Sequence, residues 1–176
     1  MEKKECLRLA AEEDLGRIVE IYNAAVPTRL ATADTTPVAI ESRREWFHRH
    51  DPAARPIWVA EKNDIVAGWV SLESFFGRPA YHPTAEISIY VAPEFQGRGL
   101  GRRLLQEAID ATPRLAVRTL LGFIFSHNNR SIHLFKAFGF EEWGRLHNVT
   151  EMDGKEYSVS IYGRRANSLI KYNNIK

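Results

Sequence analysis

The sequence has little of several features that define particular classes of protein. Its 176 residues include one cysteine, Cys6, which excludes an internal disulfide and a cysteine-based metal site. The formal net charge is only +2, too balanced to favour nucleic acid or a membrane surface as a partner. No hydrophobic run approaches membrane-spanning length, and the first residues lack the apolar stretch of a secretory signal. We therefore expect a cytoplasmic protein that uses no metal, no nucleic acid and no membrane.

The chain does have enough apolar residues for one hydrophobic core. With 44% hydrophobic and 26% charged residues, it has the size and composition of a single domain over residues 1–176. We expect an ordered core over about residues 5–163 and a frayed polar tail after Gly163. Cys6 is expected to be a small apolar residue of the first strand.

The spacing of apolar residues predicts alternating strands and helices. Strands are expected at 5–10, 57–61, 65–73, 84–91, 120–125, 142–150 and 155–162. Helices are expected at 14–25, 38–49, 102–111 and 128–138. Turn signals at 62–64 and 152–154 predict two hairpins. The run 120–125 is nearly all apolar, which is typical of a strand buried on both faces.

A glycine-rich segment lies between a predicted strand and a predicted helix. It reads Gln96-Gly97-Arg98-Gly99-Leu100-Gly101. Glycines let backbone N–H groups converge, and the helix N-terminus behind them adds unpaired donors and a partial positive charge. Three arginines at the same turn, Arg98, Arg102 and Arg103, suit a ligand with several phosphate charges. The segment therefore predicts a pyrophosphate site, with an ordinary tight turn as the alternative.

Two common phosphate motifs are excluded. Arg102 stands where a dinucleotide-binding G-x-G-x-x-G pattern needs its third glycine, and no P-loop pattern occurs in the chain. What remains, Gln96-x-x-Gly99-x-Gly101, resembles the acetyl-CoA pyrophosphate loop of the GNAT N-acetyltransferase superfamily. The predicted order of elements is similar to the GNAT order over almost the whole chain.

This resemblance implies a fold, a co-substrate and a set of binding residues. The implied fold is of the mixed α/β (α+β) class, with a central, mostly antiparallel sheet that splays at the cofactor site and is flanked by helices. The implied co-substrate is acetyl-CoA, with its pyrophosphate on the glycine segment 96–101. Its pantetheine arm is expected along the strand edge, on the backbone of Ile89, Tyr90 and Val91.

Further motifs resemble one branch of the superfamily, the phosphinothricin acetyltransferases, which include enzymes for methionine sulfoximine and sulfone. The motifs are Ile21-Tyr22-Asn23, Arg78-x-Ala80-Tyr81, Thr84-x-Glu86-x-Ser88-x-Tyr90-Val91 and Asn128-x-x-Ser131. The resemblance implies acetylation of the α-amine of a small, glutamate-like amino acid or toxic analogue. It also implies a role in detoxification and a homodimer. Asn128 is expected to bind the cofactor or support the cradle, with a helix N-cap as the alternative.

Four residues between two predicted strands are candidates for acceptor binding: Phe75, Phe76, Arg78 and Tyr81. A guanidinium suits the carboxylate or phosphinate of the acceptor, although a solvated loop arginine explains Arg78 equally well. The phenylalanines are expected to wall a pocket or to belong to the core. Tyr81 is expected to bond the acceptor or brace the loop.

Glu86 is the candidate catalytic base. Attack on a thioester requires a neutral amine, so a nearby carboxylate must take up a proton, directly or through water. Strand alternation places Glu86 on one face with Ser88 and Tyr90. A purely structural carboxylate, held by neighbouring N–H groups, is the alternative.

The expected general acid is missing. Many GNAT enzymes carry a tyrosine in the helix after the second central strand, and the phosphinothricin branch often has histidine there. Phe135 stands at this position and has no proton to donate. His133 is expected on a different helix face, and His127 at the helix start as a cap or brace. Two other functions stay open: a protein or peptide N-acetyltransferase, and an acyl-CoA-binding sensor without turnover, which Phe135 would suit.

Overall fold

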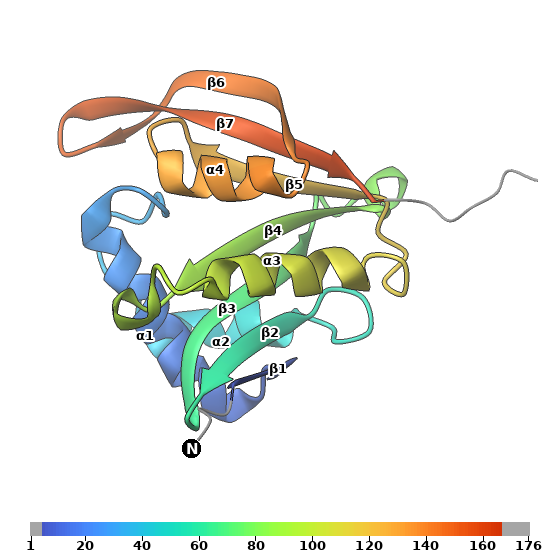
Figure 1. The fold of residues 1–176 in the computed structure, drawn as a ribbon. Helices are drawn as coiled ribbons and strands as arrows, with labels where there is room; N and C mark the ends of the chain where they lie inside the picture. Colours follow the sequence, from blue (N-terminus) through green and yellow to red (C-terminus); the bar gives the residue numbers. More distant parts are fainter. Residues whose placement is uncertain (1–4, 167–176) are drawn as a thin grey trace, which may run out of the picture.

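Seven strands form one twisted sheet in the computed structural model, which describes residues 5–166 (Figure 1). The strands are β1 (Glu5–Leu9), β2 (Ile57–Lys62), β3 (Ile65–Ser74), β4 (Thr84–Val91), β5 (Thr119–Phe125), β6 (Glu141–Met152) and β7 (Lys155–Arg165). Their order across the sheet is β1-β2-β3-β4-β5-β7-β6. Among these described strands only β4 and β5 pair in parallel, so the prediction of a mostly antiparallel sheet is confirmed.

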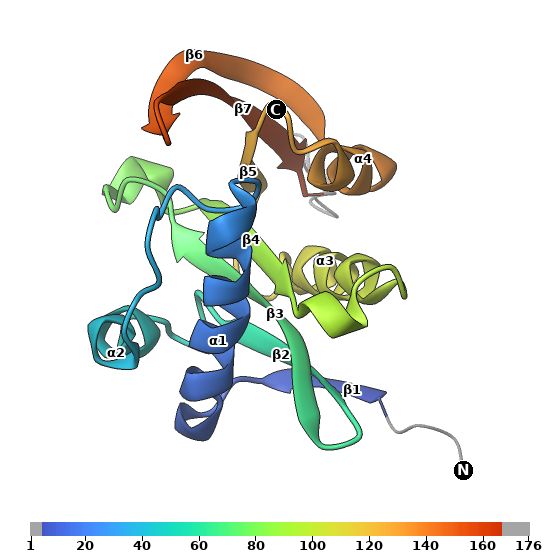
Figure 2. The same ribbon diagram turned by 90° about the vertical axis from the view of Figure 1, so that its left-hand side faces the viewer.

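Helices cover both faces of this sheet. They are α1 (Leu15–Ala25), α2 (Ile40–His48), α3 (Leu100–Ala111) and α4 (Asn129–Ala137). Figure 2 shows α1 and α2 on one face and α3 and α4 on the other. Each face has its own apolar cluster, and the larger one centres on Leu104 and Leu105 of α3. Every predicted helix and strand is present in the predicted order.

Both hairpin turns have the backbone conformation that their sequences predict. Asn63 and Asp64 have φ of 52° and 61°, and Asp153 and Gly154 have φ of 53° and 73°. Two successive positive φ angles are the mark of a type I′ turn, whose twist matches that of the strands it joins. Met152, expected in the second turn, is instead the last residue of β6.

The 120–125 run is buried on both faces, as predicted, with Phe123 as the exception at 38% exposed. One prediction about the C-terminal end of the fold is wrong. Arg164 and Arg165 belong to β7, where they pair with Leu120 and Thr119 of β5, so the tail does not begin at 164. Asn167, also assigned to that tail, lies outside the described residues. Among residues 5–166, no helix is long and apolar enough to cross a membrane.

Candidate active site

The two parallel strands at the centre of the sheet separate after a short contact. β4 and β5 pair at Thr84, Ala85 and Glu86, then diverge, as Figure 1 shows. From Ile87 to Val91, β4 therefore has an edge that β5 does not use.

Backbone alternation decides which groups face this gap. The N–H of Ala92 donates to Ala67 of the β3 side, at 2.9 Å, and a Cβ at Gly68 of β3 would lie 2.9 Å from the Tyr90 carbonyl oxygen. Because strand residues alternate in direction, the backbone groups of Ile89 and Val91 face the gap and those of Tyr90 face β3. Ile89 and the N–H of Val91 remain the predicted partners of a ligand, whereas the Val91 carbonyl accepts from Gln96 and the Tyr90 backbone is turned away.

The glycine segment forms an open cradle at the start of α3. Gly97 and Gly99 have φ of 76° and 82°, a backbone conformation that residues other than glycine rarely adopt. Within residues 5–166, the backbone N–H groups from Gly97 to Gly101 have no hydrogen-bond partner. Exposed donors at a helix N-terminus make an anion site.

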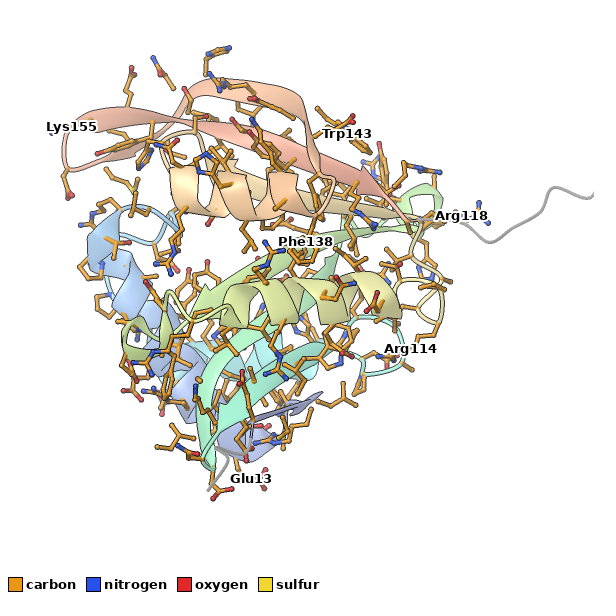
Figure 3. The ribbon with its side chains drawn as sticks, in the orientation of Figure 1. Glu13, Arg114, Arg118, Phe138, Trp143 and Lys155 are labelled. Carbon is orange, nitrogen blue, oxygen red and sulfur yellow. The ribbon has the colours of Figure 1, made fainter. Side chains whose placement is uncertain are left out.

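The side chains around the cradle divide into bracing and free groups. Gln96 donates to the Val91 carbonyl at 2.9 Å and accepts from Arg130 of α4 at 2.6 Å, so it ties three elements together. Arg98 is exposed. Arg102 lies 5.0 Å from the ring of Phe138, which Figure 3 shows between α3 and α4. Arg103 instead forms an ion pair with Glu5 of β1 at 2.5 Å, so its charge is directed away from the cradle. Nothing local in the sequence indicated Arg130.

Glu86 lies half-buried opposite another carboxylate. It pairs across the sheet with Glu73 of β3, so the two side chains share the face that α1 and α2 cover. Burial raises the pKa of Glu86, and the negative charge of Glu73 raises it further. Glu73 accepts a hydrogen bond from the Trp46 indole of α2, at 3.0 Å. Sequence reasoning missed Glu73, although two polar residues, Ser71 and Glu73, at period 2 in an otherwise apolar strand were a usable signal.

A cavity of about 150 Å³ is lined by Glu73, the cross-strand neighbour of Glu86. It lies between α1, α2, β3 and β4. Its lining combines aromatic rings with charged and hydroxyl groups: Ile18, Val19, Tyr22, Arg43, Trp46, Trp69, Ser71, Glu73, Ser88 and Tyr90. Such a mixture is typical of a site for a small polar molecule.

The predicted acceptor-binding residues form an aromatic rim outside this cavity. Phe75 lies 4.3 Å from Phe76 and 5.4 Å from Tyr81, measured between ring centroids. It also stacks toward Phe123 of β5 at 6.4 Å. Phe76 is 74% exposed, which excludes the core alternative for that residue. Arg78 is exposed on the same loop, and none of the four predicted residues lines the cavity.

Three successive carbonyl groups hold the loop after α1 in place by hydrogen bonds. The carbonyl groups of Arg29, Leu30 and Ala31 pair with the side chains of His127, Asn128 and Tyr90 respectively, each at 2.9 Å. We call residues 29–34 the strap. Asn128 also caps α4, because its Oδ1 accepts from the Ser131 N–H at 3.1 Å. The N-cap alternative for Asn128 is thus present, and its amide is engaged by protein on both sides.

Phe135 is buried against the sheet. A Cβ at Gly122 of β5 would lie 2.5 Å from its ring, so the glycine provides the space that the phenylalanine fills. Phe140 packs on the same ring at 4.8 Å. The position that holds a tyrosine in many GNAT enzymes is here part of the core.

A parallel pair that splays, unpaired N–H groups at a helix N-terminus beyond the splay and a carboxylate where it begins are the features expected of an acyl-CoA-dependent transferase. The chain belongs to the acetyltransferase (GNAT) family, whose model matches residues 16–140. It is an acyltransferase, as the resemblance implied, and the predicted fold class is confirmed.

Three similar proteins have names that specify a kind of acetyltransferase. The chain is 50% identical over 159 residues to YwnH of Bacillus subtilis strain 168, whose name assigns it provisionally as a phosphinothricin acetyltransferase; the match covers 90% of this chain and 97% of that one. It is 34% identical to the L-methionine sulfoximine/L-methionine sulfone acetyltransferase of Salmonella typhimurium strain LT2, covering 76% and 78%. A solved phosphinothricin acetyltransferase (Pat) from Sinorhizobium meliloti, in complex with AcCoA, superposes with a TM-score of 0.86 at 30% identity, covering 94% and 89%.

Proposed function

We propose that this protein transfers the acetyl group of acetyl-CoA to the α-amine of a small amino acid or toxic analogue of the phosphinothricin or methionine sulfoximine type. One observation carries the proposal. Glu86 lies where β4 and β5 separate, and the free N–H groups of 97–101 lie beyond the far end of β4. A ligand that spans from cradle to splay therefore brings its far end toward the carboxylate. The names of the relatives support the choice of acceptor.

The residues present fit acetyl-CoA. The cradle offers unpartnered N–H groups at a helix N-terminus, and a Cβ at Gly97 or Gly99 would meet no atom within 4 Å, so the space before the loop is open. The N–H and carbonyl groups of Ile89 face the gap for amide pairing. When bound, the co-substrate supplies an activated thioester.

The chain's own part in the reaction is to remove a proton from the acceptor. Glu86 accepts a proton from the acceptor ammonium, directly or through water, which frees the nitrogen lone pair for attack on the acyl carbon. The new C–N bond forms as the C–S bond breaks, the thiolate leaves with the electron pair, and the attacking nitrogen loses its second proton to solvent. Phe135 gives the thiolate no proton, so we propose that solvent protonates the departing sulfur. Arg78 is proposed to hold the acceptor carboxylate.

A thiol-release assay with acetyl-CoA tests this function. The acceptors are methionine sulfoximine, methionine sulfone, phosphinothricin, glutamate, a polyamine and a peptide. We expect turnover with amino-acid acceptors. Turnover with the peptide alone would instead support a protein acetyltransferase, which the exposed rim at Phe76 leaves room for, and no turnover at all would support a sensor.

The variant Glu86→Gln tests the base. We expect kcat to fall by about 10²–10⁴-fold while the affinity for acetyl-CoA, measured by calorimetry, stays unchanged. Glu41→Gln on the exposed side of α2 is the matched control, because it removes one carboxylate outside the site. Equal activity in Glu86→Gln and Glu41→Gln would contradict the assignment.

Homodimer formation, a cytoplasmic location and a role in detoxification remain proposals as well. Size-exclusion chromatography with light scattering tests the first. Val149 of β6 is 54% exposed, so burial within one chain does not account for this apolar residue of the last hairpin.

A further inference from the structure

The cavity on the α1 and α2 face has an unusual balance of charge. Glu73 accepts one hydrogen bond, from Trp46 to Oε1, and within residues 5–166 no cation lies within ion-pair distance of it. Glu86 is its cross-strand neighbour. Glu73 therefore lines the cavity, Glu86 faces it from the neighbouring strand, and neither carboxylate has an ion-pair partner among the described residues.

The positive group in the cavity lining already has a carboxylate partner. Arg43 pairs with Asp34 of the strap at 2.9 Å and stacks over the Tyr22 ring at 4.5 Å. His50, which follows α2, adds no charge at neutral pH, because burial lowers the pKa of its imidazole. Summed over these groups, the cavity carries an excess of negative charge.

One hydroxyl in the lining lacks a partner. The Ser71 side chain is 1% exposed, and its Oγ has no hydrogen-bond partner in the part of the chain that the structure describes. Buried polar atoms nearly always have one, so an orphaned hydroxyl aimed into a cavity indicates a group that completes it. Ser88, paired with Ser71 across β3 and β4, offers a second hydroxyl in the same lining.

From these features we infer that Glu73 is a specificity-determining residue, which makes the cavity a subsite for acceptors whose side chain ends in a neutral or cationic hydrogen-bond donor. This inference rests on the proposed function and deepens it. The acceptor amine meets Glu86, while the end of its side chain enters the cavity and donates to the free oxygen of Glu73. Ser71 then gains the partner that it lacks.

The size and the charge of the cavity select together. A volume of about 150 Å³ holds a group of about six heavy atoms, the size of benzene, which matches a short side-chain end. An acceptor ending in an anion would place a third negative charge beside two carboxylates, and like charges at this range repel. Amide and sulfoximine ends are therefore favoured over carboxylate and phosphinate ends.

Matched acceptors test the inference. Glutamine and glutamate have nearly the same shape, as do methionine sulfoximine and phosphinothricin, and each pair differs in the charge of its end. We expect kcat/KM in the unmodified protein to favour the neutral member of each pair by about tenfold or more. We expect Glu73→Gln to reduce that preference by about tenfold, mainly by improving the anionic member. Glu41→Gln is the control and should keep the preference.

A second variant covers the case in which Glu73→Gln does not fold. Ser71→Ala keeps the charges and removes only the hydroxyl, so KM for glutamine should rise several-fold with little change in kcat. A preference for the anionic acceptors in the unmodified protein, or an unchanged preference in folded Glu73→Gln, would overturn the inference while leaving the acetyltransferase intact. Absence of turnover with all four amino acids would instead reject the proposed function.

Discussion

Two influences on Glu86 act in the same direction. Burial raises the pKa of this carboxyl group and the facing charge of Glu73 raises it further. Arg43 of α2 lines the cavity but is paired with Asp34, and His50 packs on Trp46, where burial lowers the pKa of its imidazole. A base must be ionised to accept a proton, so activity falls as the pH drops through the raised pKa.

The resulting prediction concerns the acid limb of the pH profile. We expect kcat/KM to fall on the acid side with a midpoint above 4.5, the ordinary value for glutamic acid. In Glu73→Gln this midpoint should move to lower pH, because one of the two causes is removed. The measurement is initial rate against pH at low acceptor concentration. If the acid-side midpoint were the same in Glu73→Gln as in the unmodified protein, a group other than Glu86 would be responsible for it.

Gly99 allows a prediction with an internal control. Its φ of 82° disfavours any side chain, so Gly99→Ala should lower the free energy of unfolding by about 1–2 kcal/mol and raise Kd for acetyl-CoA by displacing the cradle. Gly154→Ala in the last hairpin, with φ of 73°, carries the same backbone penalty far from the cradle. It should lose similar stability and keep its affinity, as measured by thermal unfolding and calorimetry. If Gly99→Ala and Gly154→Ala bound acetyl-CoA with equal affinity, the proposal that residues 97–101 bind its pyrophosphate would be contradicted.

At the scale of elements, Asn128 connects α4 to the strap. Asn128→Ala removes the cap of α4 and the bond to the Leu30 carbonyl, and it should lower the free energy of unfolding by about 1–3 kcal/mol. Asn128→Asp keeps the capping oxygen and loses only the donor, so it should restore part of the stability. Asn129→Ala, one residue along and exposed, is the control. Denaturant unfolding measures all three, and an unaffected Asn128→Ala would show that the cap contributes nothing.

The elements were more predictable than the contacts between them. Alternation in β4 and the turn residues Asp153 and Gly154 act locally, so their effect is legible in a short stretch of sequence. The partnership of Glu73 with Glu86 depends on the register between two strands, and that of Gln96 with Arg130 on the packing of α4. Neither is encoded in local spacing. The positive φ angles at Gly97 and Gly99 could be predicted because such a turn is itself a local structure, and phosphate binding there stays a prediction.

At the scale of the whole molecule, few residue pairs join strands β1 to β4 with strands β5, β7 and β6. β4 and β5 share three residue pairs, and the strap crosses between these two groups of strands through its bonds to His127, Asn128 and Tyr90. The ion pair of Arg29 with Asp153 in the β6–β7 turn, at 2.7 Å, adds a further link on the surface.

That surface link should affect local motion more than global stability. Exposed ion pairs contribute little to unfolding free energy, so Asp153→Ala should leave the unfolding temperature nearly unchanged. It should speed amide hydrogen exchange in the strap, residues 29–34, because one end of the strap is released. Exchange measured by mass spectrometry, with Glu151→Ala on the same hairpin as the control, checks this. Equal exchange in both variants would show that the carbonyl bonds alone hold the strap.

The placement of the tryptophans has a practical consequence. Trp46 and Trp69 line the cavity, with ring centroids 5.7 Å apart, whereas Trp58 packs in the other apolar cluster and Trp143 is 48% exposed on β6. An acceptor that enters the cavity changes the surroundings of two indoles and leaves the other two as they were. The protein thus contains its own optical probe, and replacing Trp58 and Trp143 with phenylalanine would leave emission that comes from the cavity alone.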